Sequence, residues 1–371
     1  MKAALYSKDQ GERNAFIAEF AAGAPGAVIH VYPKNMKERA ARLPGVYSTT
    51  YEDFTKRDTW LHTNSLAGES ASLILENPSR YPKATTPKSR ALRRLSMQVG
   101  RKAIVDIVPF TVDIQYLYTP LSFLGREILG YAHNYAFREN YQEMGDDGVI
   151  RFAHDADVLA AKMKAACRVT YPAFLCPNRQ VVEVISTAEE QERYAARKAE
   201  LFEKEKNPRR IVTRLADTAH AFASRAEALI ETVRTSNRPT LALCNLSSYA
   251  TRLNSTLRSA GINHVKATSY QLGLTASGYL DVVYFESPIV NSYYLLDVEA
   301  GLRTDANVLH FVGDTKVDRL LFDQISHELK QIDDLTRELY AVTSGIKAGR
   351  PQMLPEQERP SSGRGTHCVG V

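Results

Sequence analysis

Lysine and arginine gather in two stretches of this 371-residue chain, and these clusters are the clearest chemical signal in it. Eight Lys or Arg and no acidic residue lie between Arg80 and Lys102. The second stretch, residues 193–214, has eight basic and three acidic side chains. Clustered positive charge attracts phosphate and releases counterions when a nucleic acid binds. The net charge is only +5, and a solvated, charged helix face would also explain the clusters.

The sequence gives little support for a metal site, a disulfide framework or a tyrosine surface dedicated to binding bases. The nine histidines are isolated and form no HExxH motif, so we expect no metal site. The four cysteines (Cys167, Cys176, Cys244 and Cys368) form no CxxC pair, which favours reduced thiols in a cytoplasmic protein. Nineteen tyrosines could stack on bases, although core packing is their more common use.

The elements that must position these residues alternate between two patterns. Short apolar runs at 27–33, 71–78 and 102–110 read as strands, and residues 13–23 and 88–99 have a helical period. Such alternation predicts an α/β fold with a parallel sheet covered by helices. We assign residues 1–145 to this first lobe.

The rest of the chain divides into three parts. Residues 146–235 contain one strand, at 181–187, and the helices 188–206 and 218–234, so we expect a mixed helical linker. A second α/β lobe, residues 236–343, opens with a buried-strand pattern and closes with the long amphipathic helix 316–342. The last part has no periodicity and is rich in Gly and Pro, which predicts a disordered tail over residues 344–371. No apolar run is long enough to cross a membrane, and the first residues do not form a secretory signal.

Five segments, taken in order, resemble superfamily-two helicases and translocases of the Swi/Snf-like type. One contains a strand that ends in the pair Pro33-Lys34, and another contains a Phe-Leu…Ile-Leu-Gly-Tyr run that is familiar from phage-encoded members. The resemblance implies two RecA-like lobes, each a parallel sheet covered by helices, and it extends over about residues 25–340. The five segments are residues 25–54, 73–92, 101–141, 155–194 and 269–312.

The resemblance also shows what is missing at the ATP site. These helicases hold phosphates with a loop ending in Gly-Lys-Thr/Ser, which occurs nowhere in the chain; its expected place contains Lys8 and Gly11 in the wrong order. Leu75-Glu76 replaces the Asp-Glu pair that anchors magnesium, and we expect Glu76 to be an exposed strand-end residue.

Two further ATP-site motifs are also incomplete. Pro109 alone remains of the Thr-Gly-Thr-Pro loop, at residues 106–109. Arg303 is the single arginine where motif six supplies two, one of them the arginine finger. We therefore predict a degenerate member, a pseudo-helicase without ATP or magnesium as cofactors.

The nucleic-acid surface does not depend on ATP, so it could remain. The resemblance places backbone-contacting residues in the loops at strand ends and on the basic helix after motif two, where three guanidiniums would share one face. The implied contacts are Lys34, Asn35, Thr50, Tyr51, Arg90, Arg93, Arg94 and Thr275.

The function predicted from these residues is DNA or RNA binding in phage or mobile-element DNA metabolism, in the host cytoplasm if the protein is phage-encoded. A replication, recombination or host-defence protein is a further expected partner. Two alternatives stay open. The chain could be an active helicase subunit completed by a partner chain, or an interaction or inhibitor module that reuses the helicase fold.

Overall fold

The computed structural model describes most of the chain, and all structural statements below concern the described residues. They are residues 1–7, 9–34, 43–80, 86–108, 115–144, 150–152, 156–169, 179–270, 278–286, 293–299, 302 and 305–344.

The first lobe is built on a six-stranded sheet in which all the pairs are parallel, in the order β3-β2-β4-β5-β1-β8. Its inner strands are apolar and buried on both faces, as is usual for parallel sheets covered by helices. The strands are β1 (Lys2–Tyr6), β2 (Val28–Tyr32), β3 (Val46–Thr50), β4 (Ser72–Glu76), β5 (Arg101–Asp106) and β8 (Cys167–Val169).

Helices cover both faces of this sheet, because successive strand residues point to opposite sides. On one face Val28 and Ile74 pack with Ile17 and Phe20 of α1. On the other face the alternate strand residues pack with α3 and α4. The helical elements of this lobe are α1 (Gln10–Ala22), α2 (Arg57–Leu66), the short η2 (Pro78–Arg80), α3 (Pro87–Gln98), α4 (Gln115–Leu124), η3 (Arg126–Ile128), α5 (Asn134–Tyr141) and α6 (Ala156–Met163). A small antiparallel pair, β6 (Gln142–Met144) and β7 (Ile150–Phe152), follows α5.

The second lobe has a five-stranded sheet, again with all pairs parallel, in the order β11-β10-β12-β13-β9. Leu229 of α9 and Leu253 and Leu257 of α10 cover one face. The strands are β9 (Arg179–Val184), β10 (Thr240–Cys244), β11 (Val265–Ser269), β12 (Asp281–Tyr284) and β13 (Asn307–Gly313). The helices are α7 (Ala188–Lys204), α8 (Pro208–His220), α9 (Ala223–Arg234), α10 (Ser247–Ser259), α11 (Tyr293–Glu299) and α12 (Lys316–Ser344).

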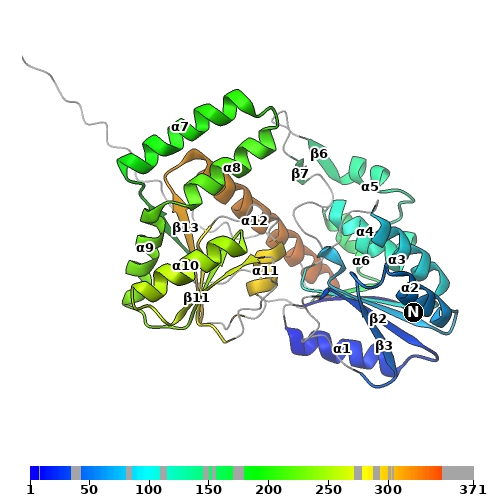
Figure 1. Cartoon of the computed structure of the whole chain (residues 1–371). Helices are drawn as coiled ribbons and strands as arrows, with labels where there is room; N and C mark the ends of the chain where they lie inside the picture. Colours follow the sequence, from blue (N-terminus) through cyan, green and yellow to red (C-terminus); the bar gives the residue numbers. More distant parts are fainter. Residues whose placement is uncertain are drawn as a thin grey trace, which may run out of the picture.

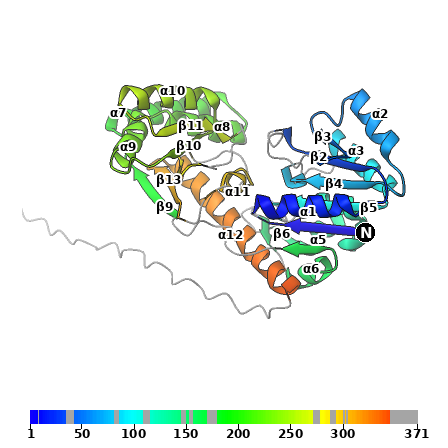
Figure 2. The same ribbon diagram turned by 90° about the horizontal axis from the view of Figure 1, so that it is seen from below.

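Helix α12 joins the two lobes. It starts directly after β13 in the second lobe and runs across to pack on α6 and β8 of the first (Figures 1 and 2). Its early apolar residues Val317 and Leu321 pack with α7 and α8. Its later ones, including Ile325 and Leu329, belong to a large cluster that also contains side chains of both sheets. The apolar stripe of one helix therefore serves two cores.

The predicted fold class, two parallel sheets covered by helices, is confirmed. The segment predicted as a mixed helical linker contributes elements to both lobes. From the predicted linker, 146–235, β8 adds to the first sheet and β9 to the second, while α7 and α8 pack against α12. The helix predicted over 218–234 is two helices that meet at Ala221 and Phe222. The predicted tail begins at the last residue of α12, and residues 345–371 lie outside the described part.

Among the described residues, no helix is long and apolar enough to span a bilayer.

Candidate nucleic-acid interface

A pocket on the first lobe lies between α2 and α3 and has a volume of about 380 Å³. Arg90 and Arg94 line it from α3, and Trp60 lines it from α2. The two arginines are exposed and stand four residues apart, so they lie on the same face of the helix. Thr55, Pro87 and Ala91 complete the lining. The pocket thus combines two guanidiniums with one aromatic ring.

Helix α3 is fixed locally by signals in its own sequence. The Thr86 side chain accepts a hydrogen bond from the Ser89 N–H at 3.1 Å, and Pro87 occupies the first turn. Leu92 and Leu95 are buried on the opposite side from the pocket and anchor the helix to the sheet. The helix contains four basic residues and no acidic one, so its positive charge is not balanced within the helix.

The Trp60 ring is held in place by the loop before α2. Its plane lies at 88° to that of Phe54, with 5.4 Å between the ring centroids. Phe54 is fully buried, whereas Trp60 is half-buried and reaches the pocket. A ring held in this way can accept a stacked base with little loss of side-chain freedom.

The prediction that three guanidiniums share one face of α3 is wrong for Arg93. This side chain is half-buried and does not line the pocket. It lies close to Tyr118 of α4. Burial raises the pKa of Tyr118, and the charge of Arg93 opposes that rise. The Nε and Nη2 atoms of Arg93 are buried, and neither has a hydrogen-bond partner within the described ranges. Residues one turn apart, Arg90 and Arg94, are the pair that faces outward.

The residues predicted to contact nucleic acid at the strand ends differ in their exposure to solvent. Lys34 is exposed, and its backbone N–H donates to the Glu52 Oε2 at 3.0 Å. Thr50 is buried, and its hydroxyl donates to the Asp53 carboxylate at 2.9 Å. Tyr51 is fully buried, with its hydroxyl donating to the Glu76 carbonyl at 3.0 Å. We therefore leave Thr50 and Tyr51 out of the interface proposed below.

Four residues singled out from the sequence cannot be placed. They lie outside the described residues, and so does Lys8 at the expected phosphate loop. The four are Asn35, Pro109, Thr275 and Arg303.

Glu76 does not occupy the exposed position that we predicted. It is completely buried, and its carboxylate lies 3.1 Å from Nε2 of His30, which is also buried. The reason is the strand order, which places the end of β4 between β2 and β5. Leu75, the residue before Glu76, is part of the hydrophobic core. Asp106, at the end of β5, accepts hydrogen bonds from the backbone N–H groups of Ser79 and Ile107 at 3.0 and 2.7 Å.

The amino terminus of α1 is occupied by carboxylates. The Asp9 side chain caps the helix by accepting from the N–H groups of Gly11 and Glu12 at 2.6 and 3.3 Å. Glu12, in the first turn, accepts from the Ser7 hydroxyl at 2.7 Å and from Arg168 at 3.3 Å. A helix amino terminus can bind phosphate because its N–H groups are free and its dipole favours negative charge. Here Asp9 takes two of these N–H groups, and Glu12 adds a second negative charge in the first turn.

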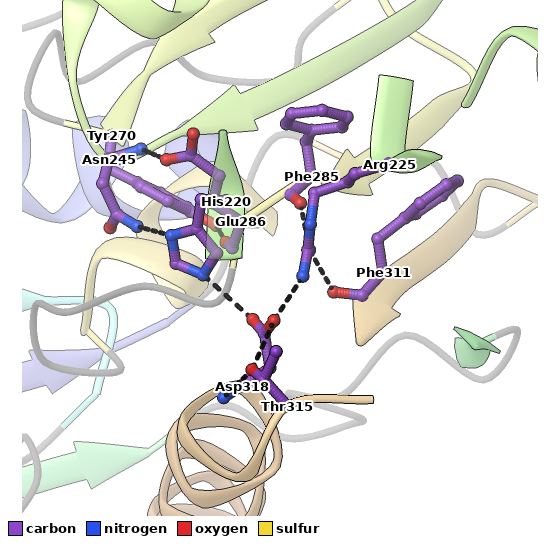
Figure 3. Close-up of polar contacts among 9 residues, drawn as sticks. All are labelled: His220, Arg225, Asn245, Tyr270, Phe285, Glu286, Phe311, Thr315 and Asp318. Carbon is purple, nitrogen blue, oxygen red and sulfur yellow. Dashed lines mark hydrogen bonds and ion pairs between the residues drawn. The ribbon is translucent and has the colours of Figure 1, made fainter. Parts of the chain in front are cut away.

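The second lobe has a buried polar network at the carboxyl end of its sheet, which the sequence did not reveal (Figure 3). Arg225 of α9 donates to the carbonyls of Phe285 and Phe311 at 2.7 and 2.9 Å, and to the Asp318 carboxylate at 2.7 Å. The other Asp318 oxygen lies 3.0 Å from Nε2 of His220. Together these bonds join α8, α9 and α12 to the ends of β12 and β13.

Asp318 is ionised within this network. Burial alone would raise its pKa, but the charge of Arg225 and the hydrogen bond with His220 outweigh burial and lower the pKa from 3.8 to about 2. One indication of this network is visible in the sequence. Some of its members directly follow an apolar strand pattern, which places them at the carboxyl end of the sheet. Among the described residues, no three His, Cys, Asp or Glu side chains lie close enough to hold a metal ion.

No protein-family model matches the chain, and no curated protein matches it. Among solved structures, it is similar to the SWI2/SNF2 ATPase core of Sulfolobus solfataricus in complex with dsDNA, with 11% identity over 92% of this chain and 90% of that one, at a TM-score of 0.41. A second structure, the SWI2/SNF2 ATPase core domain of the same organism, gives 10% identity over 90% of this chain and 85% of that one, at a TM-score of 0.33. The Pyrococcus furiosus Hef helicase domain gives 10% identity over 86% and 94%, at 0.44. At these values we draw no conclusion about function from the likeness.

Proposed function

We propose that this chain is a helicase-like protein that binds nucleic acid and does not hydrolyse ATP, and that it acts in phage or mobile-element DNA metabolism. The observation that carries the proposal is the pocket formed by Trp60, Arg90 and Arg94. The phage-type segment of the sequence supports the biological setting.

The pocket suits an unpaired nucleotide in a single strand. Its aromatic ring can stack on a base, and its two exposed guanidiniums can each take a phosphate oxygen. Stacking of this kind tolerates any base, because every base has a π-face. The proposed preference is therefore for single strands, with little sequence selectivity.

The proposal that the chain does not hydrolyse ATP is supported by the residues at the carboxyl edge of the first sheet. Asp9 accepts from two amino-terminal N–H groups of α1, which are then not free to bind a phosphate. Leu75 cannot hold magnesium, and Glu76 is engaged with His30 inside the protein. Neither ATP nor magnesium is part of the proposed function.

The test is a fluorescence anisotropy titration of a labelled oligo-dT strand with the full chain and an Arg90→Gln/Arg94→Gln variant. Removing two phosphate contacts should reduce the slope of log K against log salt by about 1.4, since each contact on a single strand contributes about 0.7. Trp60→Ala should weaken binding by about 1–3 kcal/mol at any salt concentration.

An Arg234→Gln/Arg258→Gln variant is the matched control, because both arginines are exposed on helices of the second lobe. It removes the same charge and should leave the slope closer to that of the unmodified chain. Equal slopes for the two double variants would contradict the assignment of the pocket. No binding by the unmodified chain would instead favour an interaction module that reuses the fold.

A further inference from the structure

The second lobe contains a separate pocket, of about 270 Å³, beside the buried network. Its walls come from α9, α10, the end of α8 and the end of β12. Phe222, Ile230 and Leu253 give it an apolar lining. Glu286 contributes a carboxylate, and Figure 3 shows this side chain next to His220 and Asn245.

Glu286 is fully buried, and only one of its two carboxylate oxygens has a hydrogen-bond donor among the described residues. Its Oε2 accepts a hydrogen bond from the Asn245 N–H at 2.5 Å. Its Oε1 is buried and has no hydrogen-bond partner among the described residues. Burial raises the pKa of Glu286, and the charge of Asp217 raises it further, against the opposing influence of His220 and Arg225. The charged form of this side chain is therefore disfavoured in the protein alone, and a cationic donor at Oε1 would stabilise it.

The basic groups nearby are already engaged elsewhere. Arg225 donates to two backbone carbonyls and to Asp318. His220 lies 3.0 Å from Asp318 through Nε2 and 3.5 Å from the Asn245 amide nitrogen through Nδ1. With Nε2–H donating to the carboxylate, Nδ1 is left to accept from that amide, so this ring has no N–H for Glu286. Within the described part of the chain, neither of these basic groups donates to the Glu286 Oε1, so a bound ligand can supply that donor.

The pocket carries more negative than positive charge. Glu227 lines it and is exposed at its edge, in addition to the buried Glu286. Among the described residues of the lining, the guanidinium is that of Arg252, which lies over the Tyr249 ring, 4.9 Å from its centroid. An incoming cation would thus meet two carboxylates, and its apolar stem would lie against the aliphatic and aromatic wall.

We propose that this pocket binds a cationic nitrogen group on a short alkyl stem, either an alkylammonium or an alkylguanidinium, which donates to the Glu286 Oε1. Such a group can belong to a free amine or guanidine compound, or to a Lys or Arg side chain of a partner polypeptide. The site lies in the second lobe and does not depend on the proposed nucleic-acid interface at Trp60 in the first.

Isothermal titration calorimetry on the full chain tests this, with n-butylguanidinium and n-butylammonium as probes and n-butanol as the uncharged control. We expect saturable, one-to-one binding of at least one cation, at least tenfold tighter than any binding of n-butanol. A peptide, acetyl-Gly-Gly-Arg-Gly-Gly-amide, is compared with its Gln analogue. Tighter binding of the Arg peptide than of n-butylguanidinium assigns the ligand to a polypeptide; the reverse order assigns it to a small molecule.

Glu286→Gln keeps the side-chain shape and an acceptor for the Asn245 N–H but removes the charge. It should weaken cation binding at least tenfold, whereas Glu227→Gln at the edge should weaken it less than threefold. Ala226→Met, which fills the pocket without changing its charge, should also abolish binding and covers the case in which Glu286→Gln fails to fold. Unchanged affinity in both Glu286→Gln and Ala226→Met would overturn the proposal, and so would no saturable binding of either cation to the unmodified chain.

Discussion

Replacing Asp318 with Asn should cause one of the largest losses of stability available in the second lobe. The Asp318 carboxylate is 1% exposed and holds the equally buried guanidinium of Arg225. Asn keeps the shape of the side chain and one oxygen acceptor, but it leaves Arg225 as a buried charge without a counter-charge. Breaking a buried ion pair in this way typically costs about 3–5 kcal/mol.

The pKa of Asp318 gives a second estimate of the same interaction. A shift from 3.8 to about 2 corresponds to roughly 2 kcal/mol of stability at neutral pH. Because the folded-state pKa is lowered, this stability is present above the unfolded value of 3.8 and is lost as the pH falls toward 2. The difference between Asp318→Asn and the unmodified chain should therefore be constant near neutral pH and shrink between about pH 4 and pH 2.

Urea unfolding followed by far-ultraviolet circular dichroism measures both effects. Asp323→Asn is the matched control, because Asp323 is an exposed residue on the same helix and its replacement should change stability by less than about 0.5 kcal/mol. A loss below about 1 kcal/mol for Asp318→Asn, or a difference that does not change on acidification, would refute the reasoning.

Two further predictions concern single hydrogen bonds. Thr187→Ala removes the amino-terminal cap of α7, where the Thr187 hydroxyl accepts from the Glu190 N–H at 3.2 Å, and should cost about 0.5–2 kcal/mol in urea unfolding. Ser255→Ala, at an exposed position of α10, serves as its control and should be nearly neutral. Tyr51→Phe leaves the buried Glu76 carbonyl without the tyrosine hydroxyl and should cost about 1–3 kcal/mol, whereas an unchanged unfolding midpoint would show that the bond does not stabilise the first lobe.

The fold was predictable because its signals are local and repeated. The runs at 27–33 and 71–78 contain β2 and β4, the run at 102–110 contains all of β5 except Arg101, and the basic segment 88–99 lies almost wholly within α3. Which sheet β8 and β9 join was not predictable, because both are defined by pairing with strands far away in the sequence. Local composition does not show which sheet a strand will join.

The site was predictable only in part, because the direction of a side chain depends on packing. The basic character of α3 was visible in the sequence, but that Arg93 turns toward α4 follows from the contact between two helices. Trp60 was not singled out, since no local pattern indicates that α2 and α3 lie on either side of a pocket. Glu76 was expected to be exposed because it ends a strand, and the neighbouring strands β2 and β5 explain its burial.

In the function proposed for this chain, nucleic-acid binding persists without ATP chemistry. The most direct measurement is a titration of labelled single-stranded DNA at two salt concentrations, with and without ATP and magnesium, accompanied by phosphate release from the same samples. We expect salt-sensitive binding that ATP does not change, with no phosphate released above the background. DNA-stimulated release of phosphate by the purified chain would contradict it.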